Sequence, residues 1–148
     1  MNLKFEIFMK KLIQILFTLL LVVYIEETTV LASELQKNNN GMIVRISEVE
    51  VYSEYLDEYL NEAKEVAQKS VETEKDVISI YPMVEIRNNT KIRILEIYRN
   101  QNAYKKHIES KHFKKYKKET LHMVKNLDLV DTYQICPENF AKIFKKSK

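Results

Sequence analysis

Four residue types are scarce or missing in this chain. Its 148 residues include two prolines, one glycine, one cysteine and no tryptophan. Glycine-rich loops that bind dinucleotides or nucleotide phosphates need at least two glycines, so both kinds of loop are excluded. A single cysteine excludes a disulfide within the chain and a zinc site built from four cysteines. The function must therefore come from chemistry that needs none of these features.

Positive and negative charges are nearly balanced. The 24 Lys and Arg residues against 21 Asp and Glu residues give a net charge of +3, too small to indicate a nucleic-acid-binding protein. The hydrophobic fraction of 45% is ordinary for a globular chain, and the length predicts one domain. We therefore expect a single folded domain and no nucleic-acid partner.

The first 32 residues have the three-part pattern of a secretory signal peptide. Three lysines precede an apolar run of 14 residues, Leu12–Ile25, and Val30–Ala32 places small or aliphatic residues before a cleavage point. The run is shorter than the roughly 20 residues that a membrane-spanning helix needs. We expect residues 1–32 to direct export and to be removed, with residues 33–41 as a linker. The alternative is an anchor formed by an uncleaved N-terminal segment.

Hydrophobic periodicity divides the rest of the chain into strands and helices. Alternating β-branched segments predict strands at 42–51, 76–86, 91–99 and 127–135, and helical spacing predicts helices at 53–74 and 101–126. The second helix is expected to break near Ser110. Ser53 is the expected N-cap of the first helix, and Asn88–Asn89 is the expected hairpin turn. Pro82 is expected to mark a bulge or an edge strand because it cannot donate a ladder hydrogen bond.

The element order β-α-β-β-α-β predicts an α+β fold of the ferredoxin-like split βαβ type, with both helices on one face of an antiparallel sheet. The other face of the sheet would need cover, which packing against a second copy of the chain would provide. We assign residues 42–135 to this domain and residues 136–148 to a basic C-terminal tail.

The segment Leu95–Tyr116 reads LEIYRNQNAYKKHIESKHFKKY. It has a strand with a Glu and an aromatic residue, then a helix with a His, then a small residue before a His-Phe pair. In this pattern it resembles the antibiotic biosynthesis monooxygenase domain, particularly its small quinol-monooxygenase-like members. The residues that fit the pattern are Glu96, Tyr98, Ala103, Tyr104, His107, Ser110, His112, Phe113 and Tyr116.

The resemblance implies a dimeric α+β barrel in which each subunit holds a pocket between its helices and its sheet. It also implies cofactor-free oxidation of a small aromatic or quinol substrate by dioxygen. The haem-degrading branch of the family carries an Asn on the first strand and a Trp on the second helix, whereas this chain has Arg45 and Ser47 on that strand and no Trp. No cofactor is therefore expected. The alternative function is non-enzymatic binding of a small hydrophobic metabolite on the same dimeric fold.

Oxidation without a cofactor needs a base that titrates near neutral pH, an aromatic pocket and a donor for the developing anion. The resemblance makes His107 the predicted base, and Glu96, which interrupts an apolar row of its strand, its orienting partner. The predicted substrate contacts are Tyr81, Tyr98, Tyr104, His112, Phe113 and Tyr116. The three-residue spacing of Phe113 and Tyr116 is, however, more typical of core packing.

Two other features bear on partners. His107 and His112 are five positions apart, about 140° around a regular helix, so we expect no shared metal ion. A lysine-rich helix and the basic tail offer a weak contact with an anionic surface. Exposed lysines are also common on helix faces that simply contact water. The helix lysines are Lys105, Lys106, Lys111, Lys114, Lys115, Lys117 and Lys118.

Overall fold

The computed structural model describes residues 41–146 without a gap and, before them, residues 10, 13, 14, 17, 18, 20–22, 24–26, 29, 30 and 33. The chain divides into two compact units, residues 1–35 and 36–148. Most of the predicted signal segment and linker lies outside the described residues. Among the residues that are described, no helix is both long and apolar enough to cross a membrane.

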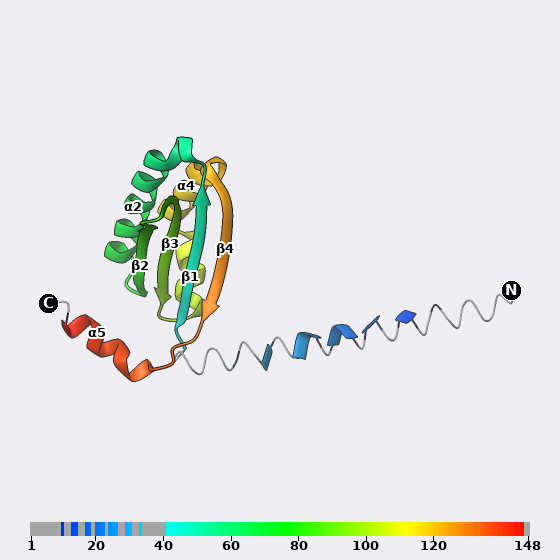
Figure 1. The fold of residues 1–148 in the computed structure, drawn as a ribbon. Coiled ribbons are helices and arrows are strands. Elements are labelled where there is room, and N and C mark those ends of the chain that lie inside the picture. Colours follow the sequence, from blue (N-terminus) through cyan, green and yellow to red (C-terminus); the bar gives the residue numbers. More distant parts are fainter. Residues whose placement is uncertain are drawn as a thin grey trace. The chain divides into compact units, whose positions relative to one another are not determined.

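The second unit contains a four-stranded antiparallel sheet in the order β2-β3-β1-β4. The strands are β1 (Ile43–Val51), β2 (Val77–Glu85), β3 (Asn88–Tyr98) and β4 (Val124–Thr132). The helices are α2 (Leu56–Thr73), α3 (Gln101–Glu109), α4 (Lys111–Thr120) and α5 (Phe140–Lys146). Figure 1 shows α2 and α4 on the same side of the sheet. The predicted ferredoxin-like α+β fold is therefore confirmed.

Three local predictions need correction. Ser53 lies in a short 3-10 turn, and Tyr55 occupies the N-cap position of α2 without a side-chain cap. The hairpin turns at Ile86–Arg87, and Asn88 already pairs with Glu85 in the sheet. The Asn88 side chain accepts a hydrogen bond from the Thr90 backbone N–H. The last strand begins at Val124 instead of residue 127.

Two other local predictions are confirmed. Pro82 lies on β2, an edge strand, where a missing N–H removes no ladder hydrogen bond from the sheet interior. The second predicted helix breaks at Ser110, which ends α3 and caps α4. The break starts a new helix at Lys111 and changes the direction in which the following side chains point.

The hydrophobic core lies between α2 and the helix-facing side of the sheet. Its buried residues are Val49, Val51, Tyr59, Ala63, Ile92, Ile94 and Met123. The helix-facing side also carries polar residues, because the register aligns Glu96 of β3 with Arg45 of β1, and Ile94 with Ser47. The core therefore adjoins a polar row within the same sheet face.

The opposite face of the sheet carries an apolar row next to charged residues such as Arg93, which pairs with Glu48 and Glu85. The register aligns Tyr81, Leu95, Ile46 and Val130 across all four strands. Tyr81 and Val130 are 61% and 38% exposed. Because neighbouring residues of a strand point to opposite faces, this row points away from the helices.

Candidate functional site

A cavity of about 470 Å³ lies between the sheet and helices α2, α3 and α4. Its apolar lining includes Val49, Ile94, Ile108, Phe113, Leu127 and Leu129. Its polar lining consists mainly of Arg45, Ser47, Tyr59, Glu96, Tyr98, Tyr104 and Tyr116. Leu127 and Leu129 of β4 are about half exposed, so the cavity is open to solvent on the β4 side. This combination of an apolar wall and a few polar groups is typical of a small-molecule site.

Glu96 is the acidic group of the cavity lining. One carboxylate oxygen accepts a hydrogen bond from Ser47 Oγ at 2.5 Å, and the other accepts one from Tyr98 Oη at 2.7 Å. These two donors come from β1 and β3 and hold the carboxylate against the sheet. A partly buried carboxylate needs hydrogen-bond donors, and these two donors compensate for the position of Glu96 in an otherwise apolar row.

Three tyrosine hydroxyls surround this carboxylate. Burial, and next the negative charge of Glu96, raises the pKa of Tyr98 far above its ordinary value. Burial also raises the pKa of Tyr59 and of Tyr116, whose hydroxyl oxygens are 2.7 Å apart. All three therefore stay protonated at physiological pH and can donate hydrogen bonds.

Arg45 places a positive charge at the position of β1 that pairs with Glu96, and Lys117 of α4 is the second cation of the cavity lining. Burial opposes its charge, but its hydrogen bond to Asp131 and the neighbouring Tyr104 raise its pKa above the ordinary value. Its Nε lies 2.7 Å from Asp131 Oδ1, and its guanidinium lies 4.9 Å from the centre of the Tyr104 ring. Arg45 is therefore a fixed cation at the cavity wall, next to an aromatic surface.

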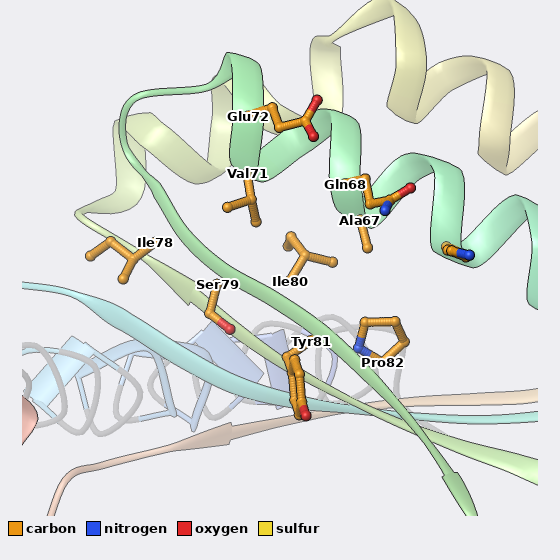
Figure 2. A pocket seen from close by; sticks show the side chains of 10 residues that line it. Ala67, Gln68, Val71, Glu72, Ile78, Ser79, Ile80, Tyr81 and Pro82 are labelled. Atoms are coloured by element: carbon orange, nitrogen blue, oxygen red, sulfur yellow. The ribbon is translucent and has the colours of Figure 1, made fainter. Parts of the chain in front are cut away.

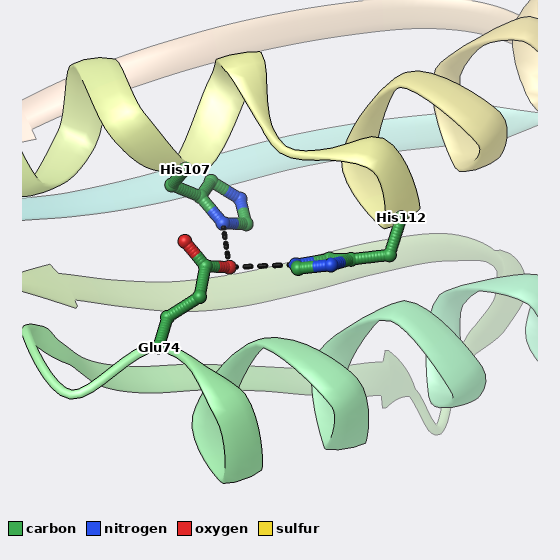
Figure 3. A group of neighbouring side chains, drawn as sticks. All are labelled: Glu74, His107 and His112. Atoms are coloured by element: carbon green, nitrogen blue, oxygen red, sulfur yellow. Dashed lines mark hydrogen bonds and ion pairs between the residues drawn. The ribbon is translucent and has the colours of Figure 1, made fainter.

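His107 does not contact Glu96 through a hydrogen bond. Its Nδ1 lies 2.8 Å from Oε1 of Glu74, and Nε2 of His112 lies 2.7 Å from the same oxygen. Figure 3 shows both imidazoles converging on the Glu74 carboxylate. The predicted orienting role of Glu96 is thus wrong, because Glu74 takes it. The expectation that the two histidines lie apart is also wrong, since the break at Ser110 interrupts the regular helix.

His107 lies behind the cavity wall. It lines a much smaller cavity of about 40 Å³ together with Glu96, Phe113 and Tyr116. Its ring lies 4.7 Å from the ring of Phe113 and 5.4 Å from that of Tyr98. Among the described residues, those that line the 470 Å³ cavity do not include His107, His112 or Glu74.

Most of the predicted substrate contacts do line the large cavity, namely Tyr98, Tyr104, Phe113 and Tyr116. Tyr81 does not. It belongs to a second groove of about 450 Å³ between α2 and β2. Figure 2 shows its side chain pointing away from α2, while Ala67, Val71 and Ile80 face one another. The reason is strand alternation, which puts Tyr81 on the face opposite to Glu96.

Four residues with polar or charged groups in these sites were not predicted as site residues from the sequence. Arg45 and Ser47 share a strand face with Val49, so alternation could have placed them beside Glu96. Tyr59 lies among core positions of its helix and carried no signal of its own. Glu74 is 33 residues from His107 in sequence, and only the folded chain brings the two together.

Comparison with known proteins agrees with this fold. The family model described as antibiotic biosynthesis monooxygenase matches residues 42–119, a little over half of the chain. The chain belongs to this family. No curated protein matches this family member. Its monooxygenase-like character rests on the family match and on the solved structures that resemble it.

Three solved structures illustrate the likeness of this monooxygenase family member. A provisionally assigned antibiotic biosynthesis monooxygenase of Bacteroides thetaiotaomicron is 38% identical, with a TM-score of 0.64, over 66% of this chain and 92% of that one. A provisionally assigned monooxygenase of Lactobacillus acidophilus is 26% identical, with a TM-score of 0.60, over 62% of this chain and 43% of that one. The third is a provisionally assigned antibiotic biosynthesis monooxygenase of Nitrosomonas europaea, 14% identical over 66% of this chain and 93% of that one, with a TM-score of 0.61. At this identity the likeness shows the fold alone.

Proposed function

We propose that the protein is a cofactor-free monooxygenase that oxidises a small aromatic or quinol substrate with dioxygen in the 470 Å³ cavity. The observation that carries this proposal is the presence of the Glu96 carboxylate, protonated tyrosines and the Arg45 cation together in the lining of one largely apolar cavity. Such a set can take a proton from a phenolic hydroxyl and stabilise the anion that remains.

The first step is removal of a proton from the substrate hydroxyl. Glu96 is the base, because its carboxylate lines the cavity whereas His107 lies behind Phe113 and Tyr98. This reverses the roles expected from the sequence. Arg45 and the hydroxyl of Tyr116 stabilise the phenolate. The apolar wall excludes water from it.

The second step is electron transfer to dioxygen. The phenolate gives one electron to dioxygen, and the resulting superoxide and substrate radical combine at a ring carbon that carries hydrogen. Glu96 returns its proton to the peroxide. The ring carbon then loses its hydrogen as a proton while the O–O bond breaks, which forms a carbonyl group and releases hydroxide. The hydroxide and the proton combine to one water molecule. One oxygen atom stays in the product and the substrate supplies all four electrons, so no external reductant is needed.

His107 has a positioning role in this proposal. Glu74 holds its ring, which packs against Phe113 and Tyr98, two residues of the cavity lining. Replacing His107 is therefore expected to loosen the wall of the cavity without removing the proton acceptor.

The enzyme is proposed to act as a homodimer. The support is the apolar row of Tyr81, Leu95, Ile46 and Val130 on the sheet face that the helices leave open. A second copy packed on this row would bury apolar side chains that are now in contact with water.

Export is proposed from the N-terminal pattern. Residues 1–32 combine a basic start, a short apolar run and small or aliphatic residues before Ser33. N-terminal sequencing of the protein purified from its own cells should begin at Ser33. A protein that retains residues 1–32 in the membrane fraction would instead support the uncleaved anchor.

Oxygen uptake tests the proposed reaction. The full chain should accelerate oxygen consumption above autoxidation with members of a panel of hydroquinones, anthrones and phenols. Glu96→Gln should lose this activity, while Glu50→Gln should keep it, because Glu50 pairs with Lys125 outside the cavity. Quinol binding without any catalysed uptake would contradict the monooxygenase and favour the non-enzymatic binder.

A further inference from the structure

A second constellation of chemically active side chains lies outside the large cavity. It consists of Glu74, His107 and His112, which come from the C-terminal end of α2, the last turn of α3 and the first turn of α4. One potential ligand atom from each residue lies within 4.8 Å of the other two. The proposed oxygenase reaction uses none of these atoms directly.

The helix break at Ser110 brings the two histidines together. Ser110 has an extended ψ of 151°, its backbone N–H donates to His107 O at 3.0 Å, and its Oγ accepts from Phe113 N at 3.2 Å. The first helix therefore ends and the second is capped at the same residue. As a result, His112 points to the same carboxylate oxygen as His107.

We propose that Glu74, His107 and His112 bind one divalent transition-metal ion, with Zn²⁺ as the best fit. Two imidazole nitrogens and one carboxylate oxygen are a common ligand set for zinc. The two nitrogens lie 2.8 and 2.7 Å from Oε1 of Glu74. Bonds of about 2.0 Å to a tetrahedral ion separate ligand atoms by roughly 3.3 Å, so a small shift of the side chains makes room for the ion.

The exposure of the three side chains shows how an ion could reach the cluster. His107 is 4% exposed, Glu74 16% and His112 21%, so the cluster is buried on the His107 side and reaches solvent beside His112. An ion can enter from that side, and water can complete its coordination. The ion would replace the imidazole protons that now make the two hydrogen bonds to Glu74.

Metal binding would join three helix ends. His107 also contacts Phe113, which lines the large cavity and lies three residues after Ser110. The ion would therefore fix the junction of α3 and α4 and the cavity wall next to it. Its affinity can be measured without substrate, so it is independent of the proposed oxygenase reaction.

The composition of the chain makes the test decisive. The chain has three histidines and one cysteine, so the only imidazole or thiol ligands outside the site are His122 and Cys136. Untagged full-length protein is stripped with a chelator and titrated with Zn²⁺ in a calorimeter. We expect one ion per chain. Glu74→Gln and His112→Ala should each weaken binding at least tenfold, while His122→Ala and Cys136→Ser should bind as the wild type does.

Thermal unfolding separates loss of the site from loss of the fold. At one fixed Zn²⁺ concentration, the Tm of the wild type and of His122→Ala should rise more than that of Glu74→Gln, whose amide oxygen can still accept a hydrogen bond. The variants should have the circular dichroism of the wild type without metal. Absence of saturable Zn²⁺ binding by the wild type would overturn the proposal. So would Zn²⁺ affinities of Glu74→Gln and His112→Ala that equal the affinity of the wild type.

Discussion

Tyr98 donates its hydroxyl hydrogen to Glu96, two residues earlier on β3, across 2.7 Å. The two side chains share the helix-facing side of the strand, where Ser47 donates to the second carboxylate oxygen. The carboxylate raises the pKa of the Tyr98 hydroxyl, second only to burial, and so keeps it a donor. A proton acceptor and a proton donor are thereby held side by side in the cavity wall.

Arg45 should determine the preference of the cavity for anions. Arg45→Met is expected to weaken binding of 4-nitrophenolate by about 10- to 100-fold, because a hydrogen bond to a charged group contributes roughly 1.5–3 kcal/mol. Binding of the uncharged 4-nitroanisole should change much less. Fluorescence titration with both ligands measures the difference.

Arg99→Met is the matched control for this experiment. Arg99 also pairs with an aspartate, Asp76, but among the described residues it lies outside the cavity lining. Its replacement should leave both affinities unchanged. If both variants lost the same affinity for 4-nitrophenolate, Arg45 would have no specific role in binding the anion.

Stability should fall steeply at high pH. The folded protein holds the protons of Tyr59, Tyr98 and Tyr116 above pH 10, where the unfolded chain releases them. Each such tyrosine lowers the free energy of unfolding by up to about 1.4 kcal/mol per pH unit above its unfolded pKa. Urea unfolding between about pH 9 and 11 measures this slope.

A tyrosine variant identifies the source of that slope. Tyr98→Phe should make the decline with pH shallower by up to about 1.4 kcal/mol per pH unit. Tyr133→Phe, at a tyrosine that is 57% exposed, serves as the control and should follow the wild type. An unchanged slope in Tyr98→Phe would show that this hydroxyl does not keep its proton in the folded state.

The general architecture was predictable from the sequence because apolar residues recur at every second position of a half-buried strand and at helical spacing on the buried side of a helix. The strands β1 and β3 alternate clearly, since one of their faces packs on the helices. The strand β4 is exposed along most of its length, so Lys125 and Asn126 looked like the end of a helix. Asn88 looked like a turn residue, yet it pairs within the sheet one residue after the turn.

The candidate site was predictable in part. Glu96 and Tyr98 share a strand face, and Tyr104, Phe113 and Tyr116 fit the family pattern of the helices. The partner of His107 could not be found, because Glu74 reaches it only through the packing of α2 against α4 and the break at Ser110. Regular helix geometry gave the wrong angle between His107 and His112 for the same reason.

Ser110 should contribute to stability through its cap. Ser110→Ala removes the acceptor of the Phe113 backbone N–H and should lower the free energy of unfolding by about 1 kcal/mol. Asn100→Ala removes the equivalent cap of α3, where Asn100 accepts from Ala103 N, and should cost about the same. Urea unfolding compares the two.

Only the Ser110 variant should also weaken binding of Zn²⁺. Ser110 fixes the junction that brings His112 to Glu74, whereas Asn100 caps the far end of α3. Calorimetric titration of both variants gives the comparison. Equal zinc affinities in Ser110→Ala and the wild type would show that this junction does not need its cap to hold the ligands.

The homodimer should depend on the exposed sheet face. Ile46→Glu places a charge in the apolar row between Leu95 and Val130 and should yield a monomer. Val71→Glu changes an apolar residue of α2 that is 46% exposed, and it should stay dimeric. Size-exclusion chromatography with light scattering measures the mass. A monomeric wild type would contradict the proposed dimer.

The transfer of a proton from the substrate to Glu96 can be observed without any turnover. Under anaerobic conditions, a quinol added to the wild type at neutral pH should develop the absorption spectrum of its anion as it binds. Glu96→Gln should bind the quinol without this spectrum, and His107→Gln should still show it. Formation of the anion in Glu96→Gln, together with its loss in His107→Gln, would contradict the account and make His107 the base.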